Sequence, residues 1–343
     1  MTPDPAQSVG RNGAGLQDLL TVEVADVYKA GRLAGRLRRD GDDVVFDYDG
    51  SYLADPESPA VAFTLPKTAE PVRASAGSAP PFFAGLLPEG ARLQAVTAGA
   101  HTSSDDHLTL LLLVGADAVG DVQILPSGAP LEDPPTLLDA SAPGVDDFAA
   151  VFARATSTDP AQLDRVSLPG IQVKVSAAMI STPVGTTSGP AILKLDPDGW
   201  PNLVANENFF MSMAGACGIP VPAHHLMRDR SGRAGLLVER FDRVVTTGAP
   251  PVRLAQEDAC QVLGRYPAAK YRLTFQEAAT GLADAVEVPA GGRARVELTL
   301  PAGVLRGRIV VRDAATGEPA AVAPVLPARP ATTPDDALGA PRV

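Results

Sequence analysis

Lys194 lies within a short apolar run, PAILKL, that leads into a turn of Asp, Pro and Gly. In an extended strand, successive side chains point to opposite faces, so Ala191, Leu193 and Leu195 share one face while Lys194 lies on the other. Two explanations are open. Either the second face is wet and the lysine is an ordinary surface charge, or its ammonium group meets an anionic ligand. The strand alone does not decide between them.

A predicted helix, NLVANENFFMSMAGACG, follows the turn and ends at a glycine. Its apolar residues recur at helical spacing, so we expect them to face the core, with Cys217 as a small buried residue. Glu207 shares the helical face of Phe210 and Ala214 and should therefore point inward. A glutamate on a helix is usually a solvated charge, but at this position it could hold the side chain of Lys194.

The elements around the lysine follow a recognisable order. The loop VSLPGIQVKVSAAM precedes the lysine strand, and the strands HHLMRD and AGLLVERFDR follow the helix. This is the element order of a protein-kinase N-lobe, in which the lysine contacts ATP phosphates. We expect a five-stranded lobe over about residues 150–250, with Lys194 and Glu207 close together.

Composition and charge exclude several classes of protein. Of the 343 residues 45% are hydrophobic, which is typical of a globular chain of about two domains. The net charge of −11 argues against a chain that binds nucleic acid by itself. The 2 cysteines and 4 histidines show no disulfide or metal spacing. The N-terminus lacks a signal peptide and no apolar run could span a membrane, so we expect a cytoplasmic protein.

Alternating and helical patterns predict an α+β fold whose parts differ in composition. The expected parts are a flexible tail (1–18), a first α+β domain (19–130), a Pro-rich linker (131–144), the kinase-like N-lobe with the start of a second lobe (145–272), a β-rich segment (273–327) and a disordered tail (328–343).

Several motifs in this order resemble the HipA-like toxin kinases of bacterial type II toxin–antitoxin systems. The first domain resembles the N-terminal domain of that family through VYKAGRLAGRL, FFAGLLPEGARLQ and LLLLVGADAVGDVQILP. The second resembles its kinase N-lobe through SLPGIQVKV, AILKL, NENFFMSMAGACGIPVP and LLVERFDR, and RLAQEDACQVLGRYPAAKY resembles the lead into the helical C-lobe. The resemblance covers about residues 22–271. It implies an ATP-dependent serine/threonine protein kinase that uses Mg²⁺.

The resemblance also implies roles for individual residues. Ser167 corresponds to a serine that can be autophosphorylated, in a phosphate loop completed by Gly170, Gln172 and Lys174. Glycine in such a loop lets backbone N–H groups approach phosphate oxygens. By the same resemblance, Lys194 contacts the phosphates with Glu207 as its partner, and Glu239 and Phe241 form the hinge that takes the adenine ring. Taken alone, the run ERFDR would also fit an ordinary strand end with exposed charges.

The resemblance is expected to stop after Tyr271. Residues 272–343 contain no His and no Asn, so they hold neither the family's Asp-x-His-x-Lys-Asn loop nor its magnesium ligands. Phosphoryl transfer needs both. No catalytic residue is therefore found in the chain. The segment from residue 273 instead alternates with Gly-containing turns, faintly resembling part of a β-sandwich. A frameshift, a gene fusion or a truncated reading frame would explain this departure.

Three hypotheses follow. In the first, the chain is the kinase toxin of a toxin–antitoxin pair, truncated, with a HipB-like helix-turn-helix antitoxin as partner and a translation component such as an aminoacyl-tRNA synthetase as substrate. In the second, it is a catalytically dead remnant that still binds nucleotide or antitoxin. The third, a surface β-sandwich protein with an unrelated N-terminus, rests only on the last segment.

Overall fold

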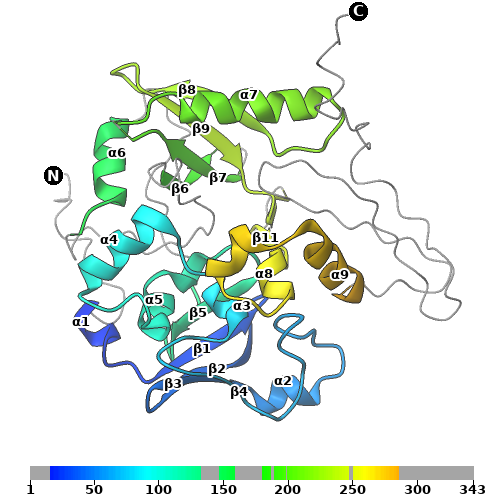
Figure 1. The fold of residues 1–343 in the computed structure, drawn as a ribbon. Coiled ribbons are helices and arrows are strands. Elements are labelled where there is room, and N and C mark those ends of the chain that lie inside the picture. Colours follow the sequence, from blue (N-terminus) through cyan, green and yellow to red (C-terminus); the bar gives the residue numbers. More distant parts are fainter. Residues whose placement is uncertain are drawn as a thin grey trace, which may run out of the picture. The chain divides into compact units, whose positions relative to one another are not determined.

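The computed structural model describes residues 16–132, 147–158, 180–186, 189–197, 199–246 and 250–285. The chain divides into two compact units, Met1–Ala269 and Lys270–Val343. The first unit contains two main β-sheets with helices packed on each, which confirms the α+β class (Figure 1). No helix among the described residues is long and apolar enough to cross a membrane.

An antiparallel sheet of five strands, in the order β4-β3-β2-β1-β5, organises the N-terminal domain. Its strands are β1 (Val24–Lys29), β2 (Arg32–Asp40), β3 (Asp43–Tyr48), β4 (Val72–Ala74) and β5 (Val122–Pro126). Helix α5 (His107–Val114) packs against this sheet, and every residue from Leu108 to Val114 is buried. Asp106 caps the helix by accepting a hydrogen bond from the Thr109 N–H.

Short helices complete the N-terminal domain. They are α1 (Leu16–Leu19), α2 (Gly50–Ala54), α3 (Pro81–Ala84), α4 (Gly90–Ala100) and the 3₁₀ turn η2 (Gly115–Asp117). The side chains of Phe82 and Phe83 on α3 join Phe46 of β3 in one apolar core. The turn η2 immediately follows α5 and brings Asp117 to the start of β5.

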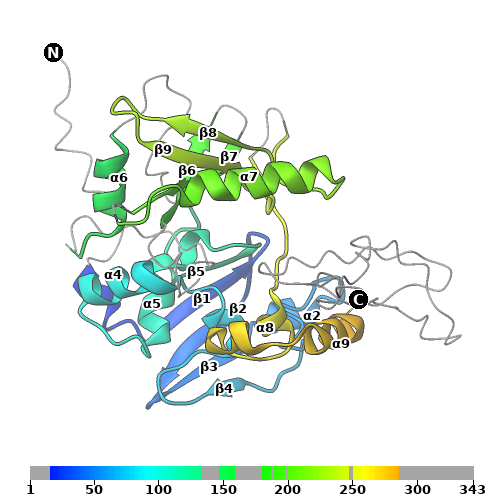
Figure 2. The ribbon, with the colours of Figure 1, turned by 45° about the horizontal axis from the view of Figure 1, so that its top comes forward.

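A second antiparallel sheet, in the order β6-β7-β9-β8, carries the lysine strand. Its strands are β6 (Ile180–Thr186), β7 (Gly189–Leu195), β8 (His224–Arg228) and β9 (Ala234–Glu239), and its helices are α6 (Phe148–Ala155) and α7 (Leu203–Ala216). Figures 1 and 2 show α7 running alongside this sheet. The described residues thus form four strands of the five that we expected.

The two faces of this sheet are apolar and are covered by different helices. Ala191, Leu193 and Leu195 are fully buried and cluster with Phe148 and Val151 of α6. On the opposite face, a smaller cluster joins Val204 of α7 to Leu236 and Val238 of β9. The alternation along β7 therefore places Lys194 on the α7 face, as the strand period predicts.

Past β9, the chain forms a short two-stranded ladder of β10 (Arg243–Val244) and β11 (Val252–Arg253), then α8 (Ala259–Val262) and the 3₁₀ segment η4 (Pro267–Arg272). The second unit begins within η4, and its described part contains α9 (Phe275–Ala285).

The β-rich segment expected from residue 273 is wrong over residues 275–285, which form helix α9. A reciprocal cap explains the helix. The Thr274 backbone N–H donates to the Glu277 carboxylate at 2.8 Å, and the Glu277 N–H donates to the Thr274 hydroxyl at 3.2 Å. Residues 286–327 of the predicted β-rich segment and both predicted tails, apart from residues 16–18, lie outside the described residues, as does most of the linker.

The expected burial of the apolar face of α7 is also wrong. Phe210 is 51% exposed, Met213 is 46% exposed and Cys217 is exposed, whereas Val204 is fully buried. The helix is apolar on more than one side, so periodicity alone could not select the side that packs on the sheet.

Candidate functional site

Lys194 and Glu207 form an ion pair between β7 and α7. The Lys194 Nζ donates a hydrogen bond to the Glu207 Oε1. The side chains are 21% and 28% exposed, so the pair lies at the border between the sheet–helix core and solvent. Glu207 does point toward the sheet, as expected, although Phe210 on the same helix does not. An ammonium group held in this way remains open to an anion on its solvent side.

Asp196 fixes the start of α7 relative to the lysine strand. Its Oδ1 accepts from the Val204 N–H at 2.8 Å and its Oδ2 accepts from the Asn202 N–H at 2.7 Å. The Asn202 side chain makes no capping hydrogen bond of its own, and its backbone is left-handed with φ 72°. The carboxylate that caps the helix thus comes from the turn two residues after Lys194, which couples the register of α7 to β7.

The predicted hinge residues lie at the end of β9, the strand that pairs with β7. Lys194 is opposite Leu236 and Ala191 is opposite Glu239, so Glu239 is about 10 Å further along β9 than the residue opposite Lys194. The Glu239 side chain is exposed and its N–H donates to the Ala223 carbonyl at 2.8 Å. The ring of Phe241 is 58% exposed and is therefore available to stack on a ligand.

A close backbone approach positions the segment that follows Phe241. At the turn between β6 and β7, Gly189 has φ 133°, and a Cβ atom there would lie 2.6 Å from the Val245 Cγ2. Only glycine fits this position without displacing Val245. The contact places residue 245 beside the turn of the same sheet that carries Lys194.

Arg240, Asp242 and Arg243 form a buried charge network that sequence reasoning missed. They are 4%, 3% and 9% exposed, so the interpretation of ERFDR as an ordinary strand end with exposed charges is wrong for these three residues. Their partners include Asp117 and the backbone of Gly120 in the N-terminal domain. The sequence does contain a signal for this network. Three charged residues occur directly after a buried apolar strand, and charged side chains that stay buried need partners.

Burial disfavours every charge in this network, and the partners of each group either oppose or reinforce that effect on its pKa. Burial raises the pKa of Asp242, but hydrogen bonds and charges from Arg240 and Arg243 bring that pKa below its ordinary value. Burial lowers the pKa of Arg243, and the neighbouring guanidinium groups of Arg240 and Arg253 lower it further. The carboxylates therefore stabilise a network in which the positive charges of the guanidinium groups are in excess.

The predicted phosphate-loop residues, namely Ser167, Gly170, Gln172 and Lys174, lie outside the described residues. The structure therefore brings together Lys194 and Glu207. It places Glu239 at the end of β9, the strand that pairs with the lysine strand, and Phe241 just after that strand.

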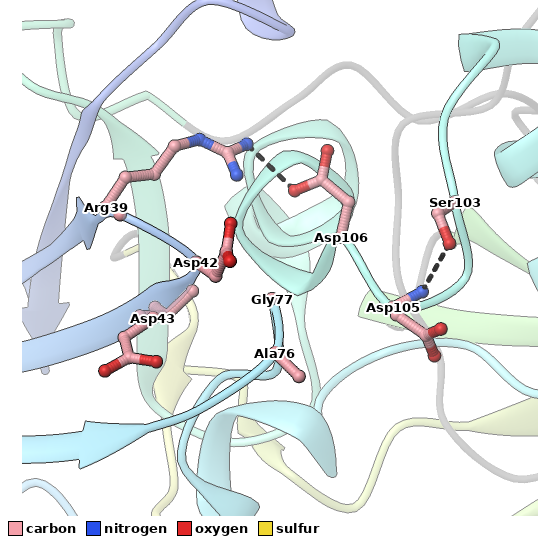
Figure 3. Close-up of a pocket in the computed structure, with 10 residues that line it drawn as sticks. Arg39, Asp42, Asp43, Ala76, Gly77, Ser103, Asp105 and Asp106 are labelled. Carbon is pink, nitrogen blue, oxygen red and sulfur yellow. Dashed lines mark hydrogen bonds and ion pairs between the residues drawn. The ribbon is translucent and has the colours of Figure 1, made fainter.

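A separate hollow of about 330 Å³ lies in the N-terminal domain, remote in sequence from Lys194, and is rich in aspartate (Figure 3). The carboxylate of Asp106 is engaged locally, because it accepts from Arg39 Nη2 and from the Thr102 hydroxyl, both at 2.8 Å. Burial raises the pKa of Asp106, but the hydrogen bonds from Thr109, Thr102 and Arg39 hold it below its usual value. Across the described ranges, no group of three or more His, Cys, Asp or Glu side chains is placed to hold a metal ion.

Comparison with known families gives two adjacent matches. Residues 25–125 match the family model described as HipA N-terminal domain, and residues 166–299 match the model described as HipA-like C-terminal domain. The second match continues past Tyr271, so the expected end of the resemblance at that residue is wrong. The range matched by the second model includes helix α9.

Two curated proteins of Sinorhizobium fredii (strain NBRC 101917 / NGR234) are similar to the chain. The one named "Putative kinase Y4mE" is 34% identical over 263 residues, covering 74% of this chain and 62% of the relative. The one named "Putative kinase Y4dM" is 28% identical over 253 residues, covering 66% of this chain and 56% of the relative. The chain thus spans about three fifths of the length of these relatives.

Among solved structures, the fold is similar to a chain of the Shewanella oneidensis MR-1 complex of the toxin–antitoxin proteins HipA and HipB with operator DNA. The TM-score is 0.55 at 20% sequence identity, and the match covers 75% of this chain and 60% of the solved chain. At this identity the likeness concerns the fold.

Proposed function

The chain belongs to the HipA-like family, and from that membership we propose that it holds the nucleotide-binding lobe of an ATP-dependent serine/threonine protein kinase. The observation that carries the proposal is the Lys194–Glu207 ion pair between a central strand and the helix that follows it. A strand lysine held by a helix glutamate is the arrangement that protein kinases use to bind ATP phosphates. Both curated relatives carry kinase in their names.

Each residue has a defined task in the proposed site. The Lys194 ammonium group contacts phosphate oxygens through charge-assisted hydrogen bonds while Glu207 keeps it from turning away. Phe241 offers its exposed ring to the adenine base. Ser167 and the loop around Gly170, Gln172 and Lys174 complete the phosphate contacts, as the family resemblance implies. The bound ATP supplies the phosphoryl group.

An active kinase of this kind would also need magnesium ions. No cluster of metal-ligating side chains occurs in the part of the chain that the structure describes. Residues 272–343 contain no Asn and no His for the family's catalytic loop. The second candidate function is a lobe that binds nucleotide or antitoxin without transferring phosphate. Incubation with γ-labelled ATP separates the two, since only an active kinase labels itself or a protein substrate.

We propose a HipB-like helix-turn-helix antitoxin as the protein partner, because the structurally similar HipA chain was solved in complex with HipB and operator DNA. A component of the translation machinery, such as an aminoacyl-tRNA synthetase, is the proposed substrate of an active form. Co-purification with a HipB-like protein tests the partner. Failure of the two proteins to co-elute at micromolar concentration would count against it.

Equilibrium binding of ATP to the 343-residue chain and to its Lys194→Met variant tests the nucleotide site. Methionine keeps the apolar stem and removes the charge, so a phosphate contact worth about 1.5–3 kcal/mol is lost. This loss corresponds to about a ten- to hundred-fold weaker affinity. Arg228→Met is the matched control, because it removes one positive charge from an exposed position of the same sheet. Equal ATP affinity for Lys194→Met and the wild type would overturn the proposal.

A further inference from the structure

Asp117 of the N-terminal domain holds three arginines that surround the predicted hinge. Its Oδ2 accepts from Arg240 Nη1 at 2.8 Å, and its Oδ1 accepts from Arg243 Nη2 at 2.7 Å. Arg253 Nη2 lies 3.2 Å from the same Oδ1. We call these four residues, together with Asp242, the Asp117 clamp. Asp117 is 16% exposed, and the arginine side chains are 9% exposed or less.

Backbone groups of the same N-terminal loop close the clamp around the guanidinium groups. The Ala118 carbonyl accepts from Arg240 and Arg243 at 3.3 and 3.2 Å, and the Gly120 carbonyl accepts from Arg243 at 3.0 Å. In the reverse direction, the Gly120 N–H donates to the Asp242 carboxylate at 3.0 Å. The residues after β9 are thus held by the N-terminal domain rather than by their own sheet alone.

The Asp117 clamp also compensates the repulsion between two like charges in the short ladder of β10 and β11. Arg243 and Arg253 are directly opposite each other in this ladder, and like charges at such positions repel. The Asp117 Oδ1 lies between them and contacts both. The clamp contains three guanidinium groups and two carboxylates, so removal of the Asp117 charge would leave two uncompensated positive charges in a buried site.

The clamp determines which way the hinge side chains point. Along the segment, Arg240 and Asp242 are buried in the clamp, whereas Glu239 and Phe241 are exposed. Phe241 and Asp242 lie in a turn that a hydrogen bond from the Arg243 N–H to the Arg240 carbonyl closes at 3.4 Å. Because the residues on both sides of Phe241 are anchored in the Asp117 clamp, the backbone of this turn is fixed, and with it the direction of the Phe241 ring.

We propose that Asp117 is a positioning residue for the nucleotide site: it fixes the segment from Glu239 to Arg243 so that Phe241 is presented to the adenine base. This inference rests on the proposed nucleotide function. It makes adenine binding at the hinge depend on a carboxylate of the N-terminal domain, which itself does not touch the nucleotide.

Because Asp117 acts on the adenine side and Lys194 on the phosphate side, two ligands separate their effects. Asp117→Asn should weaken ATP binding about three- to thirty-fold and leave the affinity for inorganic tripolyphosphate unchanged. Lys194→Met should weaken both. Asp43→Asn, which alters a surface ion pair with Arg73 in the same domain, is the matched control and should change neither affinity. Hydrogen exchange should become faster over residues 239–246 in Asp117→Asn and stay unchanged over β1 and β2.

The positioning role is overturned if Asp117→Asn has the same ATP affinity and the same hydrogen-exchange rates over residues 239–246 as the wild type, while Lys194→Met loses ATP binding. Failure of the proposed nucleotide function gives another pattern, in which Lys194→Met and the wild type bind ATP equally or neither binds it. If Asp117→Asn does not fold, Asp117→Glu replaces it, because it keeps the charge but displaces the carboxylate by one methylene. The same split between ATP and tripolyphosphate, of smaller size, is then expected, and unchanged ATP affinity contradicts the proposal.

Discussion

At the scale of single residues, the Lys194–Glu207 pair is better suited to binding than to holding the fold together. Both side chains keep about a quarter of their surface in solvent, and ion pairs of this exposure contribute about 0–1 kcal/mol to stability. The glutamate restrains the lysine, and the open side of the ammonium group is left for a ligand. The main effect of the pair is therefore to orient the ammonium group of Lys194, not to stabilise the fold.

Glu207→Gln tests this division between stability and binding. The variant keeps the shape and loses the charge that holds Lys194, so the free energy of unfolding should fall by no more than about 1 kcal/mol. ATP affinity should fall by more than the error of the titration, because the lysine becomes free to turn away. Urea unfolding and calorimetric titration measure the two quantities. A large loss of stability with unchanged ATP affinity would assign the pair a structural role.

We predict that His107 makes the stability of the N-terminal domain sensitive to acid. Its Nδ1 accepts from the Ala79 N–H at 3.1 Å, and Tyr266 packs against its ring. Burial lowers the pKa of His107, while the charges of Asp105 and Asp106 oppose that shift. The unfolded chain therefore takes up a proton near pH 6.5 where the folded protein does not, and stability should fall as the pH drops below about 6.5.

His107→Asn separates this contribution from those of other groups. The asparagine oxygen can accept the same backbone hydrogen bond but does not titrate. The drop in thermal midpoint between pH 7.5 and 5.5 should therefore be smaller in His107→Asn than in the wild type. Differential scanning calorimetry at both pH values measures it. Parallel curves for the two proteins would show that His107 does not carry the dependence.

At the scale of elements, the cap from Asp196 links the lysine strand to α7. Asp196→Ala removes both acceptors and should destabilise the protein by about 1 kcal/mol, within a range of about 0.5–2. Asp196→Asn keeps one acceptor and should lose less. Trp200, the only tryptophan in the chain, lies next to this cap and reports local unfolding by fluorescence. A urea midpoint for Asp196→Ala equal to that of the wild type would contradict the role of the cap.

The sequence was sufficient where one physical rule applied. The period of two residues in a strand separated Ala191, Leu193 and Leu195 from Lys194, and the structure buries the first three on a different face. The rule was insufficient for α7, because Phe210 and Met213 follow helical spacing as well as Val204 does. Which apolar side packs is decided by the neighbouring sheet, and that information is not local to the helix.

The buried network around Asp117 shows a second limit of sequence reasoning. Asp117 and Arg240 lie 123 positions apart in the chain yet share a hydrogen bond. Nothing in the local pattern of either segment names the other as its partner. The start of α9 is hard to predict for a different reason: Thr274 and Glu277 form a cap that signals a helix, but the Gly-rich alternation directly after it indicates strands.

At the scale of the whole molecule, the net charge of −11 predicts no DNA affinity for the isolated chain at physiological salt. The most basic strand, β2, does not change this expectation, because its arginines are matched by aspartates. These pairs are Arg32 with Asp55, Arg36 with Asp26, Arg38 with Asp47 and Arg39 with Asp106. An electrophoretic mobility shift at 150 mM salt, about the physiological ionic strength, tests this. A shift of operator-length DNA without any antitoxin would contradict the prediction.

The central claim is that Lys194 meets the phosphates of a bound nucleotide. An acyl-phosphate derivative of ATP tests this claim most directly, because an amine next to the terminal phosphate attacks the acyl carbonyl, becomes acylated and releases ATP. The chain has only five lysines, at positions 29, 67, 174, 194 and 270, so mass spectrometry can assign the acylated residue without ambiguity. The account predicts acylation of Lys194 that excess ATP suppresses. Acylation that spares Lys194, or that excess ATP leaves unchanged, would contradict it.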